Sequence, residues 1–111
     1  MNAPDVLTDF VPLVPPGHKI QDEVPARLIL KMPLLRPGSY ASDIQCPILF
    51  GICGKDSVAP ADATLAYAKK APKGVIKWYE AGHFEVYYGD AFQTAIRDYR
   101  EFLQENLPVE V

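Results

Sequence analysis

The feature that most constrains the fold of this chain is a continuous apolar run from Ile48 to Cys53. Pro47 and Gly54 bound the run, and no polar residue interrupts it. A strand with one face in water alternates apolar and polar residues, so a short unbroken run predicts a strand buried on both faces. Such strands occur in parallel sheets that carry helices on each side, and we therefore expect an α/β fold.

Two helices and a second strand are predicted after this run. Pro60 can open a helix that continues to Lys70, and Val75–Tyr79 is rich in the β-branched and aromatic residues of strands. In the last helix, Asp90 stands three residues before Gln93 and resembles a capping box. Residues at helical spacing give that helix an apolar stripe, made of Phe92, Ala95, Ile96, Tyr99, Phe102 and Leu103. The element order predicts two neighbouring parallel strands flanked by helices.

The part of the chain before Pro47 differs in composition. Eight of the eleven prolines fall within the first 47 residues, where they interrupt regular helices and strands. We expect an irregular Pro-rich arm over 1–22 and a helical linker over 23–44. Ala26–Met32 should form a short, mostly buried helix, and Arg36–Ser39 a turn followed by a helical turn to Ile44. Residues 45–108 then form the α/β segment, so the 111 residues make one domain at most.

Charge and cysteine content exclude several partners and cofactors. The formal net charge is −3 with no basic cluster, so we expect no nucleic-acid partner, and no apolar segment is long enough for a membrane span. Asp5 and Asp9 stand where a signal peptide would carry basic residues. Cys46 and Cys53 lie in or beside apolar sequence, which favours reduced, buried thiols and a cytoplasmic location. Because the histidines and cysteines lack ligand spacing, we expect no metal and no organic cofactor.

The candidate catalytic residues are Asp56 and His83, which follow the two predicted strands. The carboxyl ends of parallel strands meet at one edge of a sheet, so these side chains could share a hydrogen bond. A carboxylate that holds one imidazole nitrogen leaves the other nitrogen free to act as a general base. The alternatives are that Asp56 serves only its turn and that His83 is structural. His18, in the arm, is expected to be exposed.

Four stretches of the sequence, taken in order, resemble the C-terminal third of the α/β-hydrolase sheet. They are Ile44–Phe50, Gly54–Asp56 with Pro60, Gly82–Phe84 and the helix Phe92–Leu103. The resemblance implies that Asp56 is the acid and His83 the base of a Ser, Asp, His catalytic triad. It also implies that Val24–Ile44 is the tail of a cap region, and that a small ester or amide is the substrate once the fold is complete.

The chain departs from that family because it has no GxSxG nucleophile elbow. Ser39, Ser42 and Ser57 lack the flanking glycines, and the oxyanion hole would also be missing. Gly51–Gly54 superficially resembles a GxCxG elbow, but Lys55 stands where the second glycine is needed, so a buried core thiol is the simpler interpretation of Cys53. We therefore expect a truncated serine hydrolase that is inactive alone.

Two other functions are compatible with the sequence. Two strands make a poor sheet, so the chain should be marginally stable and prone to self-association. One alternative is therefore a non-catalytic binding or assembly module that pairs its exposed strand edge, Ile48–Cys53, with a partner chain. The other is an unrelated small α/β binding domain in which Asp56 and His83 have no functional role.

Overall fold

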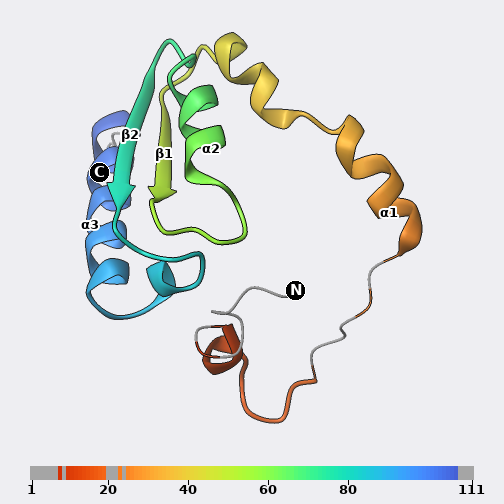
Figure 1. Cartoon of the computed structure of the whole chain (residues 1–111). Coiled ribbons are helices and arrows are strands. Elements are labelled where there is room, and N and C mark those ends of the chain that lie inside the picture. The colour runs from red at the N-terminus through yellow and green to blue at the C-terminus, as the bar shows by residue number, and fades with distance from the viewer. Residues whose placement is uncertain (1–7, 9, 20–22, 24, 108–111) are drawn as a thin grey trace.

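The computed structural model describes residues 8, 10–19, 23 and 25–107. Of the predicted arm, positions 1–7, 9 and 20–22 lie outside the described residues, and so do Val24 and the end of the chain from 108. The described part is a mixed α/β structure with two parallel strands flanked by helices (Figure 1). Its elements are η2 (Val11–Leu13), α1 (Ala26–Lys31), η3 (Met32–Leu34), η4 (Pro37–Asp43), β1 (Ile48–Cys53), α2 (Ala61–Ala68), β2 (Gly74–Tyr79), η5 (Glu85–Tyr87) and α3 (Gly89–Asn106).

The two strands form the sheet that the sequence predicts. They pair in parallel, from Ile48 opposite Gly74 to Cys53 opposite Tyr79, and α2 makes the crossover between them. Burial of β1 is less complete than predicted, because Ile52, at 2% exposure, is its one buried residue. Within the described residues the sheet has these two strands alone, so one edge of β1 has no neighbouring strand to cover it.

The two long helices lie on opposite faces of the sheet (Figure 1). Gly74 lies directly against Ala68, the buried last residue of α2. On the other face, Gly51 has no side chain, and this lets the ring of Tyr99 from α3 lie against the strand. The core on this face is small and consists of Tyr79, Ala81 and Ala95, with Val86 and Ala91 packed against it. The sheet thus holds the start of α3 close to the carboxyl ends of both strands.

The predicted stripe of α3 is buried only in part, and the predicted capping box is wrong. Ala95 is buried at 3% exposure, whereas Leu103 near the end of the helix is 51% exposed, because a two-stranded sheet is too narrow to cover the whole stripe. The helix begins at Gly89, and Tyr88 before it makes no side-chain cap. Asp90 therefore lies within the first turn, where its charge faces the positive end of the helix dipole.

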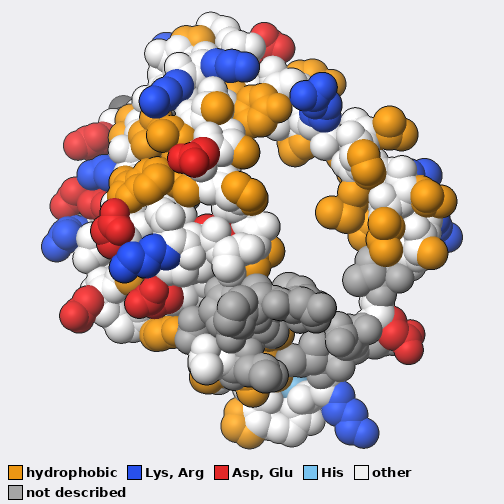
Figure 2. Space-filling model, viewed as in Figure 1, with side chains coloured by type: hydrophobic (Ala, Val, Ile, Leu, Met, Phe, Trp, Pro, Cys, Tyr) orange, Lys and Arg blue, Asp and Glu red, His pale blue; other side chains and the backbone are white. Residues whose placement is uncertain are grey.

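Helix α1 forms where the sequence predicts a helix, but the prediction that it is mostly buried is wrong. Leu30 is 79% exposed and Ile29 is 61% exposed. The reason is that α1 stands apart from the sheet and packs mainly against η3, which follows it (Figure 1). Figure 2 shows the hydrophobic side chains gathered on this helix at the surface.

The predicted turn and helical turn before Ile44 form one 3-10 helix, η4. It packs on α2, since Gly38 lies against the ring of Tyr67 and Ala41 is buried. In the described part of the chain, no helix is long and apolar enough to cross a membrane.

Candidate functional site

The candidate site is built from the loops that follow β1 and β2. Pairing between the strands continues into these loops, because the Gly54 amide donates to the Tyr79 carbonyl at 2.8 Å and the Lys55 amide donates to the Ala81 carbonyl at 3.1 Å. The backbone therefore holds both loops together at the carboxyl edge of the sheet. Asp56 on the first loop and His83 on the second come within hydrogen-bond distance as a result.

Asp56 uses its two carboxylate oxygens for different purposes. Oδ1 accepts hydrogen bonds from the amides of Val58 at 2.8 Å and Ala59 at 2.7 Å, which is the turn role considered as an alternative. Oδ2 lies 2.9 Å from Nδ1 of His83. Burial raises the pKa of Asp56, but the hydrogen bonds from Ala59, His83 and Val58 together outweigh burial and hold the pKa below its ordinary value. The carboxylate is therefore charged near neutral pH.

This contact fixes the state of the His83 ring. A carboxylate can only accept, so Nδ1 carries the hydrogen and Nε2 of the neutral ring keeps a free electron pair. The side chain is 33% exposed, and its ring meets Phe84 edge-on with centroids 4.8 Å apart. The predicted contact between Asp56 and His83 is confirmed, whereas their catalytic role stays a prediction.

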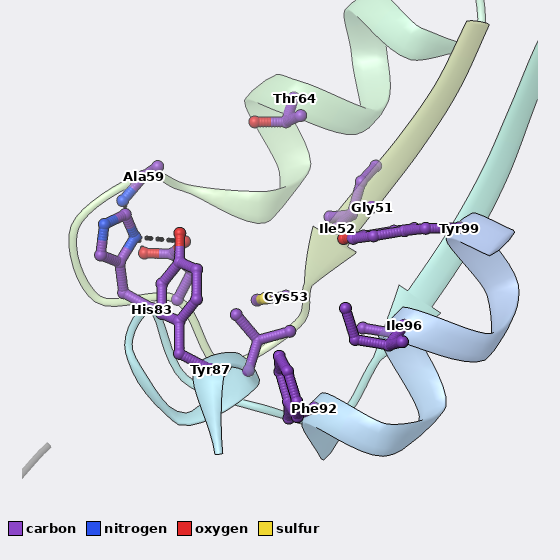
Figure 3. Close-up of a pocket in the computed structure, with 13 residues that line it drawn as sticks. Gly51, Ile52, Cys53, Ala59, Thr64, His83, Tyr87, Phe92, Ile96 and Tyr99 are labelled. Carbon is purple, nitrogen blue, oxygen red and sulfur yellow. Dashed lines mark hydrogen bonds and ion pairs between the residues drawn. The ribbon is translucent and has the colours of Figure 1, made fainter. Parts of the chain in front are cut away.

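A pocket of about 440 Å³ opens beside this pair. Figure 3 shows His83 and Tyr87 on one side, Phe92, Ile96 and Tyr99 on the other, and Cys53 between them. The walls are mainly apolar. Asp56 and His83 lie at one end of the pocket, and Thr64 and Tyr99 add hydroxyl groups elsewhere along its lining. Ligand pockets of small organic molecules typically combine such apolar walls with a few polar groups.

The contribution of α3 and η5 to this pocket was not predicted from the sequence. Phe92, Ile96 and Tyr99 were assigned to the core, because a helical apolar stripe carries no mark that separates core from pocket lining. Tyr87 was not singled out at all. Its closeness to His83 in the sequence was the one available signal.

The two cysteines differ in their surroundings, and both are free thiols. Cys53 is half-buried and lines the pocket. Burial raises the pKa of its thiol, and the nearby charges of Asp56 and Glu85 raise it further, so the thiol is neutral near pH 7. Cys46 is exposed, so the prediction of a buried thiol is wrong there, because this residue lies in the loop before β1 and not in the strand.

A group of polar residues behind the pocket joins β2 to α3. Asp98 accepts a hydrogen bond from the Tyr79 hydroxyl at 3.1 Å and binds Nζ of Lys77 at 3.3 Å. Burial and the Asp98 carboxylate together raise the pKa of Tyr79 well above its ordinary range, so the hydroxyl remains a donor. These bonds hold the pocket-lining face of α3 against the sheet.

The other candidate residues lie elsewhere. His18 is exposed, as predicted. The Ser39 hydroxyl donates to the Arg36 carbonyl at 2.7 Å and the Ser42 hydroxyl donates to Asp43 at 3.3 Å, which are the turn and surface roles expected of them. Across the described residues, no three His, Cys, Asp or Glu side chains are grouped so that they could hold a metal ion.

Comparison with known proteins finds three curated relatives. The chain is 44% identical over 109 residues to quorum-quenching protein AidA of Acinetobacter baumannii (strain MDR-ZJ06), which covers 98% of this chain and 36% of that protein. It is 26% identical over 88 residues to two Escherichia coli proteins, each named as an uncharacterized 31.7 kDa protein in the traX-finO intergenic region, across 77% of this chain and 31% of each relative. The chain thus spans about a third of the length of these relatives. No family model matches the chain, and no solved structure matches it significantly.

These comparisons overturn the predicted family. The resemblance to α/β-hydrolases is wrong, because the relative that matches nearly the whole chain is named for quorum quenching and no family model supports a hydrolase. The prediction of a truncated serine hydrolase with a catalytic triad is therefore wrong as well. The comparisons do not support the alternative of a non-catalytic assembly module either. What the comparisons establish is similarity of this chain to about a third of a protein named for quorum quenching.

Proposed function

We propose that this chain takes part in quorum quenching, the removal of a signal by which bacteria sense their density, and that the pocket beside Asp56 and His83 binds the signal molecule. The observation that carries the proposal is the 44% identity over 109 residues to a protein with that name. The chain spans only 36% of that relative, so identity alone does not assign the activity to this part of the protein. The pocket in this chain is therefore needed as a second support for the proposal.

The pocket has the size and lining for a small organic molecule. Its volume of about 440 Å³ falls in the usual range for ligand pockets. The rings of Phe92 and Tyr99 and the side chain of Ile96 offer an apolar wall, while Asp56 and His83 supply polar groups at one end. A molecule with both an apolar and a polar part can contact both regions at once.

The chemistry proposed for the pair is proton transfer. Nε2 of His83 accepts a proton from the bound molecule, or from water beside it, and the Asp56 carboxylate stabilises the imidazolium that forms. His83 is then the catalytic residue and Asp56 a positioning residue. Cys53 is not assigned as a nucleophile, since its raised pKa keeps the thiol protonated. A reducing compartment is part of the proposal because both cysteines are free thiols.

The experiment measures loss of signal from spent medium of a quorum-sensing culture, read with a reporter strain. Two proteins are assayed: the chain itself, and a chimera in which it replaces the matched 109 residues of the Acinetobacter relative. We expect at least one of them to remove the signal. If neither does, the proposed function is wrong.

The site is tested in the same assay with Asp56→Asn. The introduced side-chain amide would donate towards Nδ1, so the ring would carry its hydrogen on Nε2 and lose its proton acceptor there. We expect the rate of signal loss to fall about 10²- to 10⁴-fold, the usual contribution of general acid–base catalysis. The matched control is Asp62→Asn, an exposed aspartate in the first turn of α2. Equal rates for the two variants would refute the assignment of the site.

A further inference from the structure

The short helix η2 lies against the loop that carries His83, although the two are far apart in the sequence. Phe10, directly before η2, has its ring centroid 5.1 Å from that of Phe84 at an interplanar angle of 47°. This separation is within the range in which aromatic rings attract one another. Figure 1 shows η2 below the loops that follow the two strands.

The geometry of η2 directs two apolar side chains towards this loop. Residues three apart in a 3-10 helix lie on the same side, so Phe10 and Leu13 face one way. Pro12 fixes one backbone angle, and the Val14 amide donates to the Val11 carbonyl at 3.1 Å. Phe10 and Leu13 both line an open cavity of about 390 Å³ whose remaining walls are His83, Phe84 and Tyr87.

Phe84 connects this cavity to the candidate site. It is buried at 6% exposure, and its ring meets the His83 ring at 84° with centroids 4.8 Å apart. The imidazole is therefore restrained twice, by Asp56 at Nδ1 and by the ring of Phe84. His83 and Tyr87 line both this cavity and the main pocket, so they form the wall between the two.

We infer that Phe10 and η2 cover the loop that carries His83. Phe10 and Phe84 are the positioning residues for the His83 imidazole. Phe10 holds the ring of Phe84 in place, and Phe84 in turn holds the imidazole in the orientation that bonds Asp56. The importance of this for activity rests on the proposed function. The positioning of the His83 ring can be measured without any signal molecule, so this inference and the proposed function can be refuted independently.

The experiment is nitrogen NMR of the intact chain labelled at histidine with ¹⁵N, in buffer at about pH 8.5, which lies above the ordinary histidine pKa of about 6.5. It measures the ratio of the Nδ1–H to the Nε2–H form of His83. In the wild type the Nδ1–H form should dominate. Phe10→Ala should lower the ratio about fivefold, the factor that a typical aromatic contact contributes to an equilibrium. Phe10→Leu keeps an apolar side chain without the ring and should give an intermediate ratio.

The matched control is Val11→Ala, a neighbouring residue that is 46% exposed and does not line the cavity. It should leave the ratio at the wild-type value even if it lowers stability. His18 gives an internal reference signal in the same spectra. An unchanged ratio in both Phe10 variants would overturn the inference, and so would an equal change in Val11→Ala.

Discussion

Two parts of the chain are both rich in apolar residues but fold differently. In the α/β part, from β1 to α3, apolar runs on the strands and helical spacing on α3 bring apolar side chains onto shared faces, and Ile52 and Ala95 are buried there. In α1 and η3, apolar residues point in all directions, and Leu30 and Leu34 are about four-fifths exposed at 79% and 81%. Apolar composition alone therefore does not bury a helix, because burial needs a surface to pack against and most helical stability comes from such packing.

The largest expected difference between the two parts is the cost of removing a core side chain. Ile52→Ala should lower the free energy of unfolding by about 2 to 5 kcal/mol, because it leaves a cavity in the best-packed strand position. Urea unfolding followed by circular dichroism measures this change. A loss below about 0.5 kcal/mol would mean that the α/β part is packed no better than α1.

A smaller effect is expected from the polar link between β2 and α3. Tyr79→Phe removes the hydroxyl that donates to Asp98 and should cost about 1 to 3 kcal/mol, since the acceptor is charged and partly buried. Tyr40→Phe in η4 is the control, because Tyr40 is 68% exposed. Equal unfolding midpoints for the two variants would show that the link does not stabilise the packing of α3.

Acid should weaken the α/β part through Asp56. The pKa of this group is lower in the folded chain than in the unfolded chain, so the unfolded state binds more protons on acidification. The stabilisation is complete above the ordinary aspartate pKa of about 3.9 and is lost as the pH falls through the folded value. Unfolding curves across this range should be less pH-dependent for Asp56→Asn than for Asp62→Asn. Parallel pH profiles for the two variants would contradict the shifted pKa.

The smallest effect is expected in α1. Leu30→Ala should change the free energy of unfolding by less than about 0.5 kcal/mol, because the side chain is mostly exposed and alanine is a good helix former. Comparison with Ile52→Ala in the same urea series sharpens the contrast. A loss of several kcal/mol at Leu30 would show that α1 is packed against another surface in solution.

Sequence patterns predicted the elements that depend on local chemistry. The apolar run of β1, the β-branched run of β2 and Pro60 before α2 each correspond to an observed element, and parallel pairing then brought Asp56 to His83. Burial of α1 could not be predicted in the same way, because it depends on which surfaces lie nearby. The contact of Phe10 with Phe84 was equally inaccessible, since no periodic signal links an irregular arm to a distant loop.

Assignment of the family failed for a different reason. The stretches around Asp56 and His83 match what the carboxyl edge of a parallel sheet requires of any acid–base pair, so they describe an arrangement and not an ancestry. The overall identity to a protein named for quorum quenching gave the information on ancestry that the local arrangement of Asp56 and His83 could not give. The pair itself is independent of that correction, because it rests on the 2.9 Å contact.

The decisive comparison is between the two histidines of the chain in the signal-loss assay. His83→Gln and His18→Gln make the same chemical change, one beside the pocket and one at an exposed position. We predict that His83→Gln slows signal loss by about 10²- to 10⁴-fold while His18→Gln matches the wild type. Equal rates for the two variants would contradict the claim that His83, held by Asp56, carries the proposed activity.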